Sequence, residues 1–396
     1  MILAFILIAS TIIFAYISYI QIKFLKNQMY QKAIILDEQD YQKAATIAIE
    51  NEKFNIFSNT YQLIINLIWI FVGFNILKDI FIKNNSIFEN TLFILAWLVI
   101  TMILNLPLGF YQSLIKDKKQ GFSNMSIKLF IIDSIKSIIL AMIVGFVLLY
   151  ALIFCYDKLG SYWYIGAFIV AFVFILITLI IYPTLIVPIF NKMQKLKDEN
   201  LLNSISKLMQ KCGFSTNGVF IIDASKRDKR LNAYFGGLFK NKRVVLYDTL
   251  LKAFNEKELL AVLAHELGHF VHKDMIKNLF NSALSIFILF FLIAHLPNFL
   301  YENSNLDGIK ANAFIMLILL GNVFASLILS PILNYFSRKN EFNADKHGAK
   351  MSSKEDMKNA LITLAKENKA FVKAHNIYSF FHHSHPSIEL RLKALA

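Results

Sequence analysis

Residues 255–271 read Asn-Glu-Lys-Glu-Leu-Leu-Ala-Val-Leu-Ala-His-Glu-Leu-Gly-His-Phe-Val, and this segment guides the interpretation of the rest of the chain. Asn255 is a favourable N-cap, and Glu258 stands three residues later, where it completes a capping box. Most of the following positions are apolar, so we predict a helix that is buried on most of its circumference. Three functional polar side chains stand inside it: His265, Glu266 and His269.

The two histidines of this helix are four residues apart. Side chains at that spacing lie one above the other, so His265 and His269 are within reach of a single zinc ion. Glu266 projects beside that position and can take the proton from a zinc-bound water. The alternative is a pair of core histidines with partners inside the protein. A buried glutamate without a partner would be costly, which weighs against this alternative.

A catalytic zinc site needs a third protein ligand and one open position. We expect Glu341 to be this ligand, and Asp345, one helical turn further on the same face, to accept the free N–H of a ligand histidine. A charged helix start exposed to solvent is the alternative interpretation of this run. His272 is a rival ligand, but it stands one turn beyond His269 and several ångströms from a metal held by the first two histidines.

The end of the chain is rich in imidazole, with His382, His383 and His385 close together. Pro386 favours an extended residue before it, so we expect His385 on a turn ahead of a final helix. Its imidazole could donate to the oxyanion that develops during peptide hydrolysis. Arg391 could hold a carboxylate or a substrate carbonyl. A polar tail without contacts is the alternative, and the sequence assigns no role to His382 or His383.

The composition is that of a membrane protein. Of the 396 residues, 56% are apolar and 17% are charged, whereas soluble domains are about 45–50% apolar and about 25% charged. Disorder and a disulfide-stapled secreted scaffold are therefore excluded. Seven stretches are long and apolar enough to cross about 30 Å of hydrocarbon as helices. They cover approximately residues 1–20, 60–77, 91–110, 137–155, 163–181, 279–299 and 313–332.

The distribution of lysine predicts the orientation in the membrane. Lysines are concentrated in residues 21–60 and between the third and fourth stretches, and the intervening loops contain few. The N-terminus is then outside, with residues 191–278 and the C-terminal tail in the cytoplasm. The same rule accounts for the formal net charge of +14 without a nucleic-acid partner. At the cytoplasmic end of the fourth stretch, Asp133 and Lys136 have the spacing of an (i, i+3) pair.

These observations predict a fold that is mainly α: a polytopic membrane protein with seven transmembrane helices and a small α+β zinc-peptidase domain on the cytoplasmic side. Residues 1–190 would hold the first five membrane helices with their cytoplasmic loops. Residues 191–278 would form the cytoplasmic peptidase segment, and residues 279–334 the last two membrane helices. Residues 335–396 would be a helical segment that completes the zinc site.

The chain resembles the integral-membrane zinc endopeptidases of the type I CAAX prenyl protease family over nearly its whole length. The likeness rests on the seven spans, on the His-Glu-Leu-Gly-His run before the sixth and on the Glu341/Asp345 run after the seventh. Four shorter runs agree with it: Gly121-Phe122-Ser123, Pro188-Ile189-Phe190-Asn191-Lys192, Asn232-Ala233-Tyr234-Phe235-Gly236 and His385-Pro386.

The resemblance implies one Zn²⁺ per chain, with His265, His269 and Glu341 as ligands and Glu266 as the catalytic base. It also implies that Asn232, Ala233, Tyr234 and Phe235 belong to an edge strand that holds the substrate. An extended peptide laid on a free strand edge would satisfy its backbone there. Asn232 could add a side-chain contact, or be an ordinary turn asparagine. A water-filled chamber among the seven helices is a further implication.

The implied substrates are prenylated CAAX-type peptides at the surface of the lipid bilayer. Abundant Lys, Asn, Ile and Phe resemble the product of an AT-rich bacterial genome, so we expect a bacterial inner membrane, where such peptides can be absent. Quality-control cleavage of membrane-associated peptides is therefore an alternative. A transporter or scaffold with a structural zinc is another, although such a site would need four protein ligands. The sequence does not indicate an oligomeric state.

Overall fold

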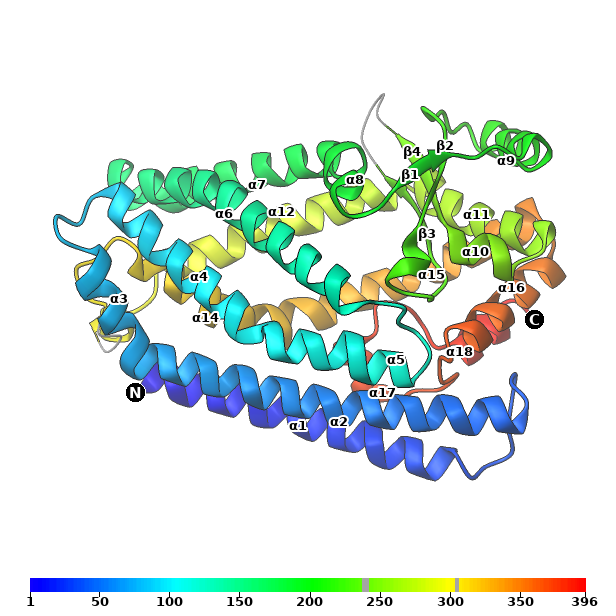
Figure 1. Ribbon diagram of the computed structural model, residues 1–396, viewed down its shortest axis with the longest axis horizontal. Coiled ribbons are helices and arrows are strands. Elements are labelled where there is room, and N and C mark those ends of the chain that lie inside the picture. Colours follow the sequence, from blue (N-terminus) through cyan, green and yellow to red (C-terminus); the bar gives the residue numbers. More distant parts are fainter. Residues whose placement is uncertain (237–241, 303–305) are drawn as a thin grey trace.

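The computed structural model describes residues 1–236, 242–302 and 306–396, and most of them are helical. Within this part of the chain, seven helical rods are long and apolar enough to cross a membrane, which confirms the predicted number. The rods run roughly along the long axis of the molecule, and a small sheet with several short helices gathers at one end (Figure 1). Helices α1 and α2 lie side by side along one side of this assembly (Figure 1).

Several rods consist of consecutive helices joined by a π-helical turn. They are α1 (Ile2–Gln28); α2 (Glu38–Ile68), η1 (Trp69–Gly73) and α3 (Phe74–Phe81); α4 (Ile87–Phe110), η2 (Tyr111–Lys116) and α5 (Asp117–Lys119); α6 (Ile127–Lys158); η3 (Gly160–Tyr162, a 3₁₀ turn), α7 (Trp163–Ile181), η4 (Tyr182–Ile186) and α8 (Val187–Phe190); α12 (Asp274–Ala294); and α14 (Asn312–Phe324), η7 (Ala325–Leu329) and α15 (Ser330–Met351).

The rods differ in extent from the apolar stretches that predict them. The second rod runs over residues 38–81 and the seventh over residues 312–351, so both continue far beyond the hydrocarbon thickness. The predicted end of the sixth span at Phe299 is wrong, because α12 ends at Ala294 and the short helix α13 (Asn298–Glu302) follows. Pro297 explains the break, since proline disfavours a helical residue before it and removes a backbone donor.

A four-stranded sheet follows the fifth rod. Its strands are β1 (Met193–Lys195), β2 (Val219–Ile222), β3 (Ala233–Gly236) and β4 (Arg243–Tyr247), in the spatial order β1-β2-β4-β3. Strands β2 and β4 are parallel, and the other two pairs are antiparallel. Strand β3 therefore lies at one edge of the sheet, as the family resemblance implies for Asn232 to Phe235, although the strand itself begins at Ala233 and ends at Gly236.

The remaining helices surround this sheet and the C-terminal tail. They are α9 (Glu199–Lys211), η5 (Ala224–Lys226, a 3₁₀ turn), α10 (Asp248–Ala253), α11 (Glu256–Val271), α16 (Lys354–Glu367), α17 (Asn376–His382) and α18 (Ile388–Ala394). Leu246 of β4, Leu263 of α11 and Leu361 of α16 are fully buried in one shared core. Segments on both sides of the membrane hairpin α12–α15 thus fold as one hydrophobic unit.

The sheet is tied to the membrane helix α6 by a charged contact between residues far apart in the sequence. Asp133 does not pair with Lys136. Its carboxylate accepts from Nε and Nη2 of Arg227 at 2.7 and 3.0 Å, and Lys136 donates to the carbonyl oxygen of Ile189 at 2.8 Å. Bidentate contacts between an arginine and a carboxylate have a defined geometry. They hold the loop before β3 against the end of a membrane rod.

Helices α11 and α15 approach each other at backbone distance. A Cβ atom on Gly268 would lie 3.0 Å from the Cα of Ala344 and 3.1 Å from the Cβ of His347. A Cβ on Gly348 would lie 3.3 Å from the carbonyl oxygen of Ala261. Glycine on both helices therefore permits this crossing, which brings residues near 265 and residues near 341 together.

We predict that Gly268→Ala lowers stability, because the added methyl meets the backbone of α15 and an overpacked core typically costs about 1–3 kcal/mol. Gly109→Ala is the matched control: it lies in helix α4, and its new Cβ would be an ordinary 3.7 Å from the Phe130 ring. Thermal unfolding in detergent should show a lower midpoint for Gly268→Ala alone. A Gly268→Ala midpoint at or above that of the wild type would contradict the close crossing.

Candidate active site

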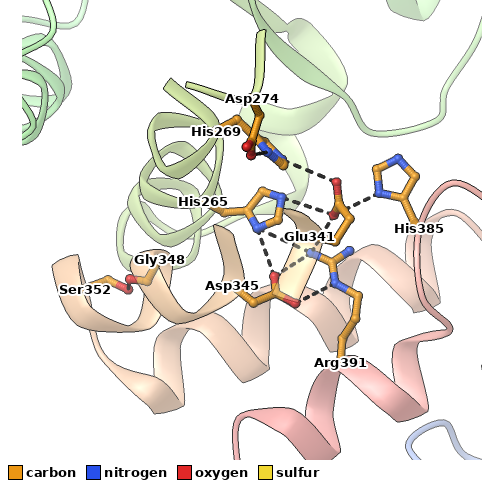
Figure 2. A network of polar contacts seen from close by, with 9 residues as sticks. All are labelled: His265, His269, Asp274, Glu341, Asp345, Gly348, Ser352, His385 and Arg391. Carbon is orange, nitrogen blue, oxygen red and sulfur yellow. Dashed lines mark hydrogen bonds and ion pairs between the residues drawn. The ribbon is translucent and has the colours of Figure 1, made fainter. Parts of the chain in front are cut away.

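Three side chains that the sequence proposes as metal ligands converge between α11 and α15. One ligand atom each from His265, His269 and Glu341 lie within 4.8 Å of one another. Nε2 of His265 is 3.5 Å from one carboxylate oxygen of Glu341, and Nε2 of His269 is 3.3 Å from the other. Figure 2 shows both imidazoles turned toward this carboxylate. His265 and Glu341 are buried, and His269 is partly exposed.

Each imidazole is held from behind by a carboxylate. Nδ1 of His265 lies 2.9 Å from Asp345, and Nδ1 of His269 lies 2.9 Å from Asp274 (Figure 2). With Nδ1–H donating to these oxygens, each ring directs the lone pair of Nε2 toward Glu341. The contact of Asp345 is the one that the sequence predicts.

The sequence pattern does not identify Asp274 as a partner of His269. Asp274 stands just beyond α11, where Lys273 adopts a left-handed backbone conformation (φ 58°) and turns the chain into α12. This turn brings the aspartate back to His269, five residues earlier. The sequence does show an acidic residue just after the helix that carries the histidines. Whether its side chain points back to His269 depends on the conformation of the turn at Lys273.

Arg391 binds a carboxylate of the protein itself. Its Nε and Nη2 donate to the two oxygens of Asp345 at 2.9 and 2.6 Å, and Nη2 lies 3.7 Å from Glu341. The arginine is 8% exposed. Of its two predicted roles, holding a carboxylate agrees with this geometry, whereas contact with a substrate carbonyl would require these bonds to break. Arg391 compensates the buried negative charge of Asp345.

His385 approaches the centre from the opposite side. Its Nδ1 lies 2.9 Å from the carboxylate of Glu341, while its side chain is 63% exposed (Figure 2). Glu266 follows His265 on α11 and is partly buried. An exposed imidazole and a carboxyl group therefore adjoin the ligand group, where a substrate can reach them.

The protein environment shifts the pKa values of His265, Glu266 and His269 on α11. Burial alone would lower the pKa of His265, but hydrogen bonds to Asp345 and Glu341 outweigh it and raise this pKa to about 9. The pKa of His269 is likewise raised, because bonds to Glu341 and Asp274 outweigh burial. Burial raises the pKa of Glu266. The carboxylates around the two imidazoles thus favour their protonated forms, and a bound cation would have to displace those protons.

The donor set fits zinc. Two imidazole nitrogens and one carboxylate oxygen are a common set of protein ligands in catalytic zinc sites. Ligands at about 2.0–2.1 Å in a tetrahedron stand roughly 3.3 Å apart, close to the observed separations of 3.3 and 3.5 Å. The three residues named above form the group that could hold a metal ion within the described part of the chain.

The segment predicted to hold a substrate lies at the edge of the sheet. Asn232 precedes β3 and is exposed, and its backbone carbonyl oxygen accepts from Tyr247 N–H on β4 at 3.2 Å. Ala233 and Phe235 point toward the core that contains α11, whereas Tyr234 packs toward Tyr182 of the fifth rod. Side chains of this strand therefore contact both the core around α11 and the fifth rod.

The remaining histidines lie outside the ligand group. His272 caps the end of α11, and its ring is 6.0 Å from that of His347. His382 packs against Phe14 and Tyr378. The carbonyl oxygen of His383 accepts from Arg338 at 2.6 Å, and burial lowers the pKa of the His383 imidazole to about 4. These contacts assign structural roles to His382 and His383, on which the sequence is silent.

Two family models together match almost the entire chain. The model described as CAAX prenyl protease N-terminal, five membrane helices, matches residues 21–192, and the model of peptidase family M48 matches residues 195–396. The chain belongs to peptidase family M48. Its metalloendopeptidase class and its multi-pass membrane character, both expected from the sequence, follow from this membership and the seven rods.

The matches between this M48 chain and individual relatives cover most of both chains. CAAX prenyl protease 1 of Saccharomyces cerevisiae is 30% identical over 91% of this chain and 86% of its own. The homolog of Arabidopsis thaliana is 33% identical over 79% of this chain and 74% of its own. The crystal structure of S. mikatae Ste24p is similar with a TM-score of 0.90 and 29% identity, and the match covers 100% of this chain and 98% of that one.

Asp274→Asn tests the role of the carboxylate behind His269. Loss of the charge behind His269 should weaken zinc binding by about 10- to 100-fold, the usual cost of removing a partner of a ligand histidine. The measurement is competition with a fluorescent chelator. Asp356→Asn is the control, because Asp356 lies in the first turn of α16, where its carboxylate accepts from Ser353 at 2.7 Å. Equal zinc affinities of Asp274→Asn and the control would refute the role of Asp274.

Proposed function

We propose that the chain is a zinc-dependent endopeptidase that cleaves membrane-associated peptides, with His265, His269 and Glu341 as ligands and Glu266 as general base. The observation that carries this proposal is the convergence of two oriented imidazoles on the buried carboxylate of Glu341. Membership of peptidase family M48 supports it from an independent direction. When bound, zinc supplies Lewis acidity that polarises a carbonyl and acidifies water.

Glu266 performs the proton transfers in this proposal. Its raised pKa makes the carboxylate a better base toward an attacking water than an exposed glutamate would be. After attack, the same carboxyl group returns the proton to the leaving amine. Its position next to His265 on a rigid helix keeps the carboxyl oxygens beside the reacting carbonyl, because both residues share the backbone of α11.

His385 stabilises the developing oxyanion. Its imidazole stands 2.9 Å from Glu341 and remains largely exposed, so it can turn from the carboxylate to a substrate oxygen. A donor placed in this way is typically worth about 10²–10³ in rate. Asp345 and Asp274 hold the ligand rings, and Arg391 compensates the charge of Asp345 without touching the substrate.

The proposed substrates are peptides that enter from the membrane and pair with the edge of β3. The relatives named CAAX prenyl protease 1 support prenylated CAAX-type peptides as the substrate class. An apolar lipid attached to the peptide agrees with a site at the end of seven membrane rods. Cleavage of other membrane-associated peptides for quality control uses the same chemistry, and comparison of prenylated with unmodified peptides separates the two.

We further propose that the active site faces the cytoplasm and that the N-terminus lies outside. The lysine-rich loops support this orientation. The expected bacterial inner membrane rests on composition alone, and the relatives compared here are eukaryotic proteins. A structural zinc in a transporter is disfavoured, because it would be closed by four protein ligands and the described residues supply a group of three.

Glu266→Gln tests the chemical role directly. The variant keeps the size of the side chain but cannot accept a proton, so we expect about one zinc per chain and a 10²- to 10⁴-fold loss of turnover. Turnover is measured with an internally quenched prenylated peptide, and zinc content by atomic absorption. Glu256→Gln, an exposed position in the first turn of the same helix, is the matched control.

Chelation should abolish cleavage by the wild type, and added zinc should restore it. Zinc-replete Glu266→Gln that cleaves at the wild-type rate would show that the base is another residue. Chelator-resistant cleavage would remove the metal from the mechanism.

A further inference from the structure

A cavity of about 410 Å³ adjoins the proposed active site between α2 and residues 368–388. His385 lines it and at the same time contacts Glu341 at 2.9 Å. The volume lies within the usual range of sites for small ligands. A group released or held next to the scissile bond can therefore enter this cavity.

The lining of the cavity carries excess positive charge. Arg230, Lys369 and Lys373 face it, against one carboxylate, that of Glu52, which accepts from the hydroxyl of Tyr378 at 2.6 Å. Arg230 is paired with acidic side chains outside the lining. Among the ion pairs of the described residues, none involves Lys369 or Lys373.

The surroundings of Lys369 hold its ammonium group in place. Nζ donates to the carbonyl oxygen of Gln120 and lies 4.8 Å from the centre of the Phe122 ring. Gly121 leaves room for it, because a Cβ there would be 2.7 Å from Nζ. Burial lowers the pKa of Lys369, and the charges of Lys43 and Lys229 lower it further. An anion in the cavity would relieve this repulsion.

The backbone of Lys369 is also in an unfavourable conformation. It follows the end of α16 with φ 46°, and Ala370 N–H binds the carbonyl oxygen of Ala365, which completes a Schellman turn. Glycine or asparagine usually occupies this left-handed position, because a Cβ makes it costly. A lysine at this position indicates that its side chain has a use that offsets the cost.

The cavity lies beside the N-terminal end of β3, next to the edge of this strand that does not pair with β4. Backbone N–H of Tyr247 on β4 binds the carbonyl oxygen of Asn232, so the backbone groups of Leu231 and Ala233 point to the free edge. Leu231 N–H donates to the side chain of Asn368 at 2.8 Å, and the amide of Asn368 reaches the Leu231 carbonyl at 3.5 Å. A peptide paired with Ala233 and Phe235 must therefore leave the strand at Leu231, beside Asn368 and Lys369.

We propose that this cationic cavity binds the C-terminal carboxylate of the substrate, with Lys369 and Lys373 as its recognition residues. The peptide then runs antiparallel to β3, with its C-terminal end at Leu231 and its lipid-bearing end toward Tyr182 and the membrane rods. Three extended residues span about 10 Å, so a short fragment reaches from the scissile bond into the cavity. The inference rests on the proposed peptidase function and adds to it the direction and the end group of the substrate.

The test compares two forms of one internally quenched prenylated peptide, with a C-terminal acid or a C-terminal amide. Because a hydrogen bond to a charged group typically corresponds to about 10- to 100-fold in affinity, zinc-loaded wild type should favour the acid in kcat/KM by at least tenfold. Lys369→Gln/Lys373→Gln should bring the acid-to-amide ratio close to one through a larger rise in KM for the acid than for the amide. Lys369→Arg should keep the preference.

Lys366→Gln is the charge-matched control, because Lys366 is exposed on α16 and does not line the cavity. It should leave the ratio as in the wild type. Equal cleavage of acid and amide by the wild type would overturn the inference while leaving the peptidase function intact. An acid preference that survives the double substitution would also overturn it.

A binding experiment tests recognition of the C-terminal carboxylate independently of peptide cleavage. Fluorescence anisotropy of the acid and amide peptides is measured with zinc-loaded Glu266→Gln, which holds the peptide without the proposed base. Tighter binding of the acid that depends on Lys369 and Lys373 supports the cavity even if turnover fails. Equal binding of both peptides counts against it. Binding of anionic lipid vesicles without acid preference would assign the charge to lipid headgroups and overturn the proposal.

Discussion

The backbone contact between α11 and α15 is the constraint on which the site depends. Gly268 and Gly348 let the two helices cross closely enough for Glu341 to stand between the imidazoles of His265 and His269. A larger side chain at either glycine would have to push the helices apart, and metal ligands tolerate displacements of only a few tenths of an ångström. The membrane rods contribute through this crossing, because α15 continues the seventh rod without a break.

Charge compensation is the second requirement of the same region. Glu341, Asp345 and Asp274 are nearly excluded from water, and each lies within a few ångströms of a histidine of the site. Burial of such charges is costly unless each is hydrogen-bonded. Arg391 from the last helix and the two imidazoles supply those bonds to Asp345 and Asp274, and the same imidazoles face Glu341 at 3.5 and 3.3 Å. The C-terminal tail is thus part of the centre, although it lies far from α11 in the sequence.

Much of this arrangement was predictable from local patterns. The capping box of Asn255 and Glu258 is present with both of its hydrogen bonds, and seven membrane rods match seven apolar stretches. The errors have physical causes. Pro297 ends the sixth rod before its apolar stretch ends, and Asp133 binds Arg227 from a distant loop instead of Lys136 on its own helix. Neighbours on one helix are visible in a sequence, whereas partners brought by the fold are not.

The amino-acid sequence by itself determined the membrane character of the chain, the helix that carries His265, Glu266 and His269, and the carboxylate candidate at position 341, since hydropathy and helical spacing depend on neighbouring residues alone. Only the tertiary structure decided that Asp274 orients His269, that Arg391 binds Asp345, and that Lys369 meets the end of β3 in a cavity. These contacts depend on a left-handed turn, a helix crossing and the packing of separate segments. Each of them joins residues whose relation is set by the path of the chain through space.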